Sequence, residues 1–475
     1  MKNNIFEDLK QKVDSDKSHM SRRDALKFMG ISPIAASVLA TTTTSSVANA
    51  SEDVQGKIVI VGGGAGGIMA LSRLSSTIKN PDITIIAPNE VHLYQPGQVF
   101  VGAGEMKVED LKIDNNNYID QDKVTWVKDE VATFDADNNL VVTRAGKEIK
   151  YDVLVVASGI QYHYEQIKGL KEEDIGTNGI TSVYLSDLEK GTAVGATATW
   201  DWFNELKEAA KTKKPKVIYT QPNTPIKCGG APQKMLYLSA DFLKQDGLSA
   251  EYSFVSSKKE LFHLPEVDKA LHEVQSGYDK ITSMFKHHLN SIDVKAKKAT
   301  FIHAYEKEVY DEDMEETEVV SFADKVVMDY DFIHIVPPMS PVDSVVKSKL
   351  INDAGWLDVD KNSLQHKRYK NVFGIGDVCG IPMGKTGGSA RHHGPILVDN
   401  IISFMKKEEP KAIFDGYTVC PIKTQYGKIM MAEFNYDGPA PSFPLAIDQS
   451  RWVWWAFDLY MLKPMYQYLM LPGRM

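Results

Sequence analysis

The sequence predicts an α/β protein with two Rossmann-like dinucleotide-binding domains, and three observations carry this prediction. An apolar strand over residues 57–61 runs directly into the glycine-rich turn 62–67. A second apolar strand, 151–156, ends in small residues, and a third, 216–220, opens the middle of the chain. Apolar runs of this length bounded by turn residues are typical of buried parallel strands.

The bulk composition indicates a globular protein of two or three units. The chain has 475 residues, of which 43% are hydrophobic and 25% charged, so a sizeable core can form. Its net charge of -9 argues against nucleic acid as the main partner, because phosphate binding depends on clustered Lys and Arg. The three cysteines are too few for a disulfide framework, although one specific pair stays possible. No metal site is predicted.

The first fifty residues have the pattern of an export signal. Residues 21–27 (Ser-Arg-Arg-Asp-Ala-Leu-Lys) resemble a twin-arginine motif, an apolar run follows over 28–40, and Ala48-Asn49-Ala50 supplies a cleavage site. The apolar run is shorter than the roughly 20 residues that a membrane span needs. An ordinary N-terminal helix is the alternative, but residues 41–50 show no amphipathic pattern. We therefore predict export to the periplasm.

The glycine turn has the spacing that binds a dinucleotide. Gly62, Gly64 and Gly67 form GxGxxG between a strand and an apolar helix, which allows a tight turn, close approach to a pyrophosphate and close helix packing. The strand 83–86 is followed by Ala87, where an acid usually binds the adenosine ribose. Glu90, or Asn89, is the candidate to replace it.

Two further strands indicate that the nucleotide is FAD. The strand from Tyr151 ends at Gly159, in a form similar to the second fingerprint of two-dinucleotide flavoproteins. The strand 371–377 ends in Gly-Asp, where Asp377 would bind the ribityl chain, or would cap a helix, or both. By contrast, the strand 216–220 runs into 221–228, where prolines and a cysteine replace a phosphate-binding glycine turn. FAD binding is therefore predicted, and NAD(P)H binding is not.

These assignments divide the chain into five parts. We expect a twin-arginine signal peptide over 1–50, the first part of the FAD-binding domain over 51–160, and a second Rossmann-like domain without a glycine fingerprint over 161–335. The second part of the FAD-binding domain follows over 336–420, and a C-terminal amphipathic membrane-contact region over 421–475.

Several motifs together resemble the sulfide:quinone oxidoreductase family, which is related to the flavin subunit of flavocytochrome c sulfide dehydrogenase. They cover nearly all of the chain after the signal: Tyr94-Gln95-Pro96-Gly97, Pro225-Ile226-Lys227-Cys228-Gly229-Gly230-Ala231-Pro232-Gln233-Lys234, Val336-Pro337-Pro338-Met339-Ser340-Pro341, Phe373-Gly374-Ile375-Gly376-Asp377 and Asp415-Gly416-Tyr417-Thr418-Val419-Cys420-Pro421.

The resemblance implies a pair of redox-active cysteines beside the flavin. Cys228 is the first member, and we take Cys379, after the last FAD strand, as the second. The chemistry also asks for a pair, because hydrosulfide attacks a disulfide and leaves a persulfide and a thiolate. Both cysteines follow strands, at the sheet edge where ligands bind. Cys420 is interpreted as a packed thiol.

The resemblance also implies how the cofactor is held. Gln95 and Lys385 are expected at the flavin, where a cation favours reduction. No cysteine lies between residues 51 and 227, so a thioether tether has no candidate there and FAD is expected to be non-covalent. His392 and His393 either relay quinone protons or lie on a surface helix face.

The C-terminal tail has the composition of a membrane interface. Trp452, Trp455, Leu459 and Leu462 recur at helical spacing, and Pro464 interrupts the apolar run. Two short interfacial helices are predicted rather than a span, because Trp and Tyr favour the headgroup level. A core helix or a dimer contact is the alternative.

The sequence thus predicts an FAD-dependent sulfide:quinone oxidoreductase, peripherally bound to the membrane. Its expected partners are hydrogen sulfide, quinone and a sulfane sulfur acceptor, and a homo-oligomer is possible. The main alternative is the flavin subunit of a sulfide dehydrogenase that passes electrons to a cytochrome c.

Overall fold

The computed structural model describes residues 52–187, 191–311 and 316–475. The predicted signal peptide over 1–50 lies outside the described residues. Among those that are described, no helix combines the length and the apolarity that crossing a membrane requires.

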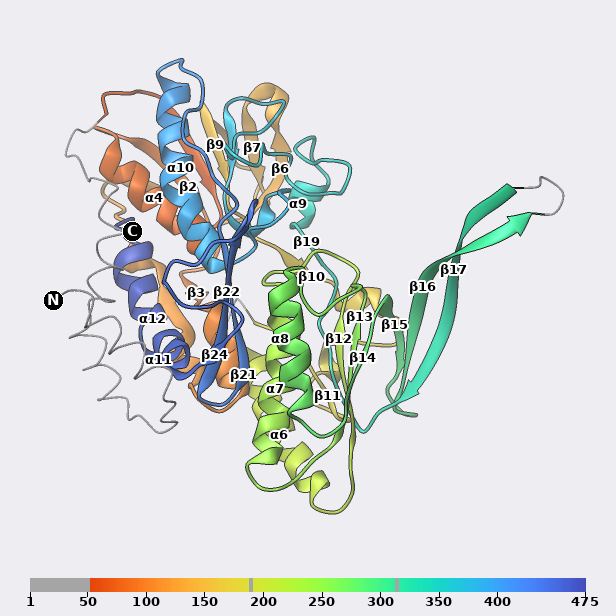
Figure 1. Cartoon of the computed structure of the whole chain (residues 1–475). Coiled ribbons are helices and arrows are strands. Elements are labelled where there is room, and N and C mark those ends of the chain that lie inside the picture. Colours follow the sequence, from red (N-terminus) through yellow and green to blue (C-terminus); the bar gives the residue numbers. More distant parts are fainter. Residues whose placement is uncertain (1–51, 188–190, 312–315) are drawn as a thin grey trace.

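The first sheet holds five parallel strands in the order β20-β9-β1-β2-β5. Its strands are β1 (Lys57–Val61), β2 (Asp82–Ile86), β5 (Val124–Val127), β9 (Val153–Val156) and β20 (Val372–Gly374). Helices α4 (Ala65–Thr77) and α10 (Gly387–Met405) contact each other beside this sheet (Figure 1). Because β20 comes from far along the chain and joins β9, two distant segments build one nucleotide-binding unit.

The second sheet is also parallel, in the order β11-β18-β12-β13-β14. Its strands are β11 (Ile180–Thr181), β12 (Lys216–Gln221), β13 (Glu251–Ser256), β14 (Ile281–Met284) and β18 (Phe332–His334). The accompanying helices are α6 (Val194–Ala210), α7 (Ala231–Lys244) and α8 (Pro265–Ser276). Two parallel sheets with helices confirm the predicted α/β class with Rossmann-like units.

Antiparallel pieces surround the two parallel sheets. A long hairpin of β16 (Lys298–Asp311) and β17 (Glu316–Asp329), flanked by β15 (His287–Asp293), projects from the body (Figure 1). A smaller sheet is formed by β6 (Val131–Asp135), β7 (Leu140–Thr143) and β8 (Glu148–Lys150). Short elements complete this part: β3 (Val91–Leu93) with β4 (Lys112–Asp114), β10 (Gln161–Tyr162) with β19 (Met339–Ser340), α5 (Gln98–Gly102) and α9 (Asp343–Val346).

The last sixty residues form a small sheet and a helical tail. The sheet contains β21 (Thr418–Gln425), β22 (Lys428–Asn435), β23 (Gly438–Pro439) and β24 (Ser450–Arg451), all antiparallel. The tail consists of α11 (Trp452–Tyr460), α12 (Leu462–Met465) and a π-helical turn over Tyr466–Met470. Strand β21 contacts α7, and α11 contacts β22, so the tail is docked on the body.

The side chains that the tail exposes are not the ones expected of an interfacial helix. Trp452, Trp454 and Trp455 are buried, whereas Tyr468 is 67% exposed. The helix breaks at Met461, as expected from Pro464, which has no N–H to donate to the carbonyl of Tyr460. The tryptophans are therefore core residues, and a membrane contact by this tail would have to use its other side chains.

Candidate functional site

The glycine turn after β1 has the geometry of a phosphate cradle. Gly62 has φ +118°, and a Cβ there would meet the carbonyl oxygen of Ala157 at 2.4 Å. A Cβ on Gly67 would lie 1.9 Å from the carbonyl oxygen of Gly62, so neither position admits a side chain. Gly64, by contrast, faces open space at the start of α4. The free N–H groups of this helix terminus fit a pyrophosphate.

The cradle continues along the ends of the neighbouring strands. Gly159, after β9, has φ +68°, and Gly376, after β20, has φ +79°; a Cβ at either position would meet nothing within 4 Å. Asp377 follows, half-buried, and burial raises the pKa of its carboxyl. These residues and Gly64 leave room for a dinucleotide along the sheet edge, so the site fits the FAD that was predicted.

The ribose end of the cradle departs from the sequence prediction. Glu90 is bound to Lys128 and its side chain is 54% exposed. Asn115 lies closer to the glycine turn, because its Nδ2 donates to the carbonyl oxygen of Gly63 at 3.1 Å and to that of Asn89 at 3.0 Å. The sequence reasoning overlooked Asn115, which lies beyond the second strand. The role of Glu90 stays a prediction.

Gln95 and Lys385 both lie near the cysteine loop. The Oε1 of Gln95 accepts a hydrogen bond of 2.7 Å from Lys227, the residue before Cys228. The Nζ of Lys385 donates to the carbonyl oxygens of Asp377 at 2.8 Å and Cys379 at 2.7 Å. Lys385 therefore stabilises the loop after β20 through two hydrogen bonds to its backbone. Its predicted contact with the flavin remains a prediction.

The two sulfur atoms that the structure brings together belong to Cys228 and Cys420. Their Sγ atoms lie 3.0 Å apart, although the residues are 192 positions apart in the chain. Cys228 has φ +53°, a strained backbone for a residue with a side chain, and strain of this kind is concentrated at functional sites. A Cβ on Gly230 would meet the Sγ of Cys420 at 2.9 Å, so the close approach of loop and strand requires a glycine there.

A lysine accompanies this sulfur pair. The Nζ of Lys234, in the first turn of α7, donates to the Sγ of Cys228 at 3.1 Å. Lys234 is only 5% exposed. The hydrogen bond from the Cys420 thiol and the Lys234 charge hold the pKa of Cys228 well below its usual value, while the pKa of Cys420 is raised. Of the two sulfurs, Cys228 is therefore the one whose thiolate is favoured.

Cys379 does not join the pair, which corrects the sequence-based choice of the second cysteine. Its side chain is fully buried, and a Cβ on Gly374 would meet its Sγ at 2.9 Å. Burial raises its pKa to about 12, so it stays a neutral thiol. The sulfur beside Cys228 comes instead from Cys420, which had been interpreted as a packed thiol. The motif Asp-Gly-Tyr-Thr-Val-Cys-Pro already contained this residue, but no local pattern reveals what β21 packs against.

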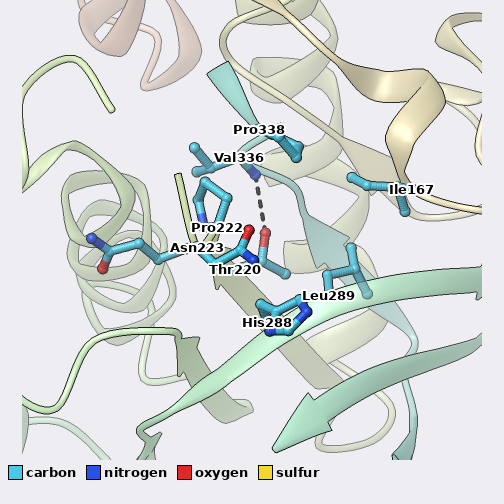
Figure 2. Close-up of a pocket in the computed structure, with 9 residues that line it drawn as sticks. Ile167, Thr220, Pro222, Asn223, His288, Leu289, Val336 and Pro338 are labelled. Atoms are coloured by element: carbon cyan, nitrogen blue, oxygen red, sulfur yellow. Dashed lines mark hydrogen bonds between the residues drawn. The ribbon is translucent and has the colours of Figure 1, made fainter. Parts of the chain in front are cut away.

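A small cavity lies at the carboxyl end of β12. The cavity there has a volume of about 10 Å³, enough for about one water molecule (Figure 2). Figure 2 shows the Oγ1 of Thr220 accepting a hydrogen bond from the backbone N–H of Val336, at 3.0 Å. Pro222 and Pro338 line the same cavity. That NAD(P)H does not bind stays a prediction.

The two adjacent histidines have different surroundings. His392 stacks on Tyr417 with ring centroids 4.1 Å apart, and its Nε2 pairs with Arg391. His393 is fully buried, and its Nδ1 accepts from the backbone N–H of Gly376 at 3.2 Å. Burial lowers the pKa of both rings, to about 4 and about 3. Both are therefore neutral near pH 7, and neither lies on an open surface face.

The comparisons with known proteins agree with this arrangement. Residues 56–195 match the family model "Pyridine nucleotide-disulphide oxidoreductase". The chain is 38% identical to "Sulfide:quinone oxidoreductase, mitochondrial" of Dictyostelium discoideum, over 88% of this chain and 86% of the relative. It is 34% identical to the protein of the same name from Mus musculus, with the same two shares.

A solved structure has the same fold. The sulfide:quinone oxidoreductase from the hyperthermophilic bacterium Aquifex aeolicus superimposes with a TM-score of 0.64, over 86% of this chain and 91% of that one, at 21% sequence identity.

The fold and the nucleotide cradle define an FAD-dependent oxidoreductase of the pyridine nucleotide-disulphide type. With the identities just given, the chain belongs to the sulfide:quinone oxidoreductase family. The predicted family and fold class are confirmed.

Proposed function

We propose that the chain oxidises hydrogen sulfide at the Cys228–Cys420 pair and reduces quinone. The sulfur contact of 3.0 Å, with Lys234 at 3.1 Å from Cys228, is the observation that carries this proposal. The relatives at 38% and 34% identity are named for sulfide and quinone, which favours quinone over a cytochrome c as the electron acceptor.

The cysteine pair supplies the sulfur chemistry. When Cys228 and Cys420 are joined as a disulfide, hydrosulfide attacks one sulfur and the other leaves as a thiolate. We assign the leaving thiolate to Cys228, because Lys234 stabilises its negative charge. The buried Cys420 then carries the persulfide. Attack by a sulfane sulfur acceptor on the outer sulfur returns Cys420 to a thiol.

Closing the cycle requires the loss of two electrons from the two reduced cysteines. The chemistry that FAD would supply when bound is the acceptance of these two electrons and their transfer to quinone. The chain would hold the cofactor with Gly62, Gly64, Gly67, Gly159 and Asp377, and no covalent link is proposed. Lys234 acts as a fixed cation: its hydrogen bond to the sulfur favours the Cys228 thiolate whenever the disulfide is open.

The predicted location remains part of the proposal. The twin-arginine pattern supports export of an already folded, FAD-loaded protein. In the tail, Tyr468 at 67% exposure is the aromatic side chain available to an interface. We propose peripheral membrane binding through this end of the chain, where a lipid-dissolved quinone would approach.

Anaerobic mixing tests the reaction. Purified holoenzyme is mixed with sulfide while the flavin absorbance is followed, and a quinone analogue is added afterwards. Bleaching and then recovery are expected; recovery with cytochrome c but not with quinone would favour the alternative acceptor. Absence of bleaching, with the FAD spectrum intact, would contradict sulfide as the electron donor.

A further inference from the structure

A continuous series of hydrogen bonds joins the C-terminal tail to the glycine turn. The hydroxyl of Tyr466, in the π-helical turn, lies 2.6 Å from the Nε2 of His92 on β3. The Nδ1 of His92 lies 2.7 Å from the Oδ1 of Asn115, which follows β4. The Nδ2 of Asn115 donates to the carbonyl oxygen of Gly63 at 3.1 Å. We call Tyr466, His92 and Asn115 the tail network, and it ends at the nucleotide cradle.

The direction of each hydrogen bond in the tail network is fixed. The Nδ2 of Asn115 donates to the carbonyl oxygens of Gly63 and Asn89, so its Oδ1 is the atom that faces the histidine. The Nδ1 of His92 therefore carries a proton. Burial lowers the pKa of His92 to about 4, so the ring is neutral near pH 7 and its Nε2 accepts. The hydroxyl of Tyr466 is the donor to this nitrogen.

The tail network constrains the peptide between Gly63 and Gly64. In a planar trans peptide the carbonyl and the N–H point in opposite directions. Because Asn115 holds the carbonyl of Gly63, the N–H of Gly64 points away from Asn115. The turn is closed on the side of Asn115, since a Cβ on Gly63 would lie 2.7 Å from the Cβ of Ala87, whereas a Cβ on Gly64 would meet nothing within 4 Å. The N–H is thus directed to the open side, as a phosphate cradle requires.

A second contact links the tail to the same unit. The guanidinium of Arg73 on α4 donates to the backbone oxygen of Met475. Gly473 has φ +73°, and a Cβ there would lie 2.6 Å from the Cγ of Arg73, so this close approach requires a glycine. Figure 1 shows the C-terminal end of the chain beside α4, the helix that begins at the glycine turn. The tail therefore contacts both the helix and, through the tail network, the turn.

We propose that Tyr466, His92 and Asn115 are positioning residues for FAD, through which the C-terminal tail holds the glycine turn in its binding conformation. The inference rests on the part of the proposed function that places FAD at this cradle, and it is independent of the electron donor and acceptor. Coupling of this kind is reciprocal: whatever the docked tail adds to the affinity for FAD, bound FAD adds to the docking of the tail.

Release of FAD from the full-length holoenzyme tests the inference. The purified protein is diluted, and the rise in flavin fluorescence gives the rate of release. Tyr466→Phe removes one hydroxyl and leaves the Nε2 of His92 without its donor, so release is expected to be about five- to tenfold faster. Asn115→Asp replaces the N–H donors by a carboxylate that faces the carbonyl of Gly63, and should accelerate release on the order of 100-fold.

A double-variant cycle and a matched control separate positioning from packing. His92→Leu removes both ring nitrogens, and adding Tyr466→Phe to it should produce no further acceleration, because the hydroxyl acts through the ring. Tyr118→Phe removes another tyrosine hydroxyl that binds the tail, at 3.1 Å from the carbonyl oxygen of Gln467. Since Tyr118 lies outside the tail network, this variant should release FAD at the wild-type rate.

The inference would be overturned by wild-type FAD release in both Tyr466→Phe and His92→Leu. Equal acceleration in Tyr118→Phe would also overturn it, because the loss would then come from weaker docking of the tail as a whole. Additive effects in the double variant would assign the loss to packing. Failure of the proposed function looks different: the wild-type holoenzyme would keep its FAD without being bleached by sulfide, and the variants would still release FAD faster.

Discussion

Two cysteine environments, one after a strand of each parallel sheet, show what favours a thiolate in this fold. Cys379 follows β20 and is fully buried, and burial raises its pKa to about 12 although the Nζ of Lys385 binds its carbonyl oxygen. Cys228 follows β12 on a strained backbone, with Cys420 at 3.0 Å and Lys234 at 3.1 Å. Both cysteines lie where parallel strands end and ligands bind. Position alone therefore does not confer reactivity; we expect it to come from the hydrogen bonds that Lys234 and Cys420 make to the sulfur of Cys228.

The largest expected effect comes from removing either sulfur of the pair. Cys228→Ser and Cys420→Ser should each lower the rate of flavin reduction by sulfide by a factor on the order of 1,000 or more, because no disulfide can form. FAD should stay bound. Stopped-flow absorbance measures the loss, and sulfide-driven bleaching in Cys420→Ser at the wild-type rate would disprove the pairing.

Removing the cation should give a smaller, pH-dependent loss. In Lys234→Met the pKa of Cys228 is expected to rise, so less thiolate is present at a given pH. The rate of Cys228 alkylation near pH 7 should fall by about 10- to 100-fold, as a rise of one to two pKa units implies. The loss should shrink as the pH rises, because the thiol ionises again. A loss independent of pH would indicate a purely structural role for Lys234.

The tail provides a test with a moderate expected effect. Tyr468→Asp places a charge on the exposed aromatic of the tail and should weaken sedimentation with liposomes by several-fold. Reduction of a water-soluble quinone analogue should be unchanged, whereas a long-chain quinone in liposomes should be reduced more slowly. A point variant is preferable to a truncation after Ser450, which would remove the buried Trp452, Trp454 and Trp455 from the core. Unchanged liposome binding by Tyr468→Asp would place the membrane contact elsewhere.

The smallest effect on activity is expected at Cys379. Cys379→Ala removes a fully buried sulfur and should lower the free energy of unfolding by about 1–2 kcal/mol, through a small cavity. Sulfide-driven bleaching should keep its wild-type rate. Denaturant unfolding and stopped-flow absorbance measure the two quantities. If this variant lost bleaching while it retained FAD, the contrast between the two cysteine environments would be wrong.

The features that could be predicted from the sequence are those that depend on short local patterns. The glycine turn at Gly62, Gly64 and Gly67 is read from its spacing after a strand, and Cys228 from its motif. Cys420 could not be paired in this way, because its place beside Cys228 depends on β21 packing against α7, a tertiary contact between distant segments. Cys379 was preferred because it follows a nucleotide-binding strand. Lys234 was within the quoted motif, but only its helical position shows that it reaches the sulfur.

The same distance along the chain has a consequence for biosynthesis. Cys228 and Cys420 are separated by 192 positions, and the strand of the second belongs to the last sheet of the chain. A nascent polypeptide that has emerged only as far as the second Rossmann-like unit has no disulfide for hydrosulfide to attack. Under the proposed function, reaction with sulfide therefore requires that the carboxyl-terminal sheet has docked, after the strands that hold the nucleotide have been synthesised. An incomplete chain that lacks β21 cannot form this disulfide and so cannot react with sulfide in this way.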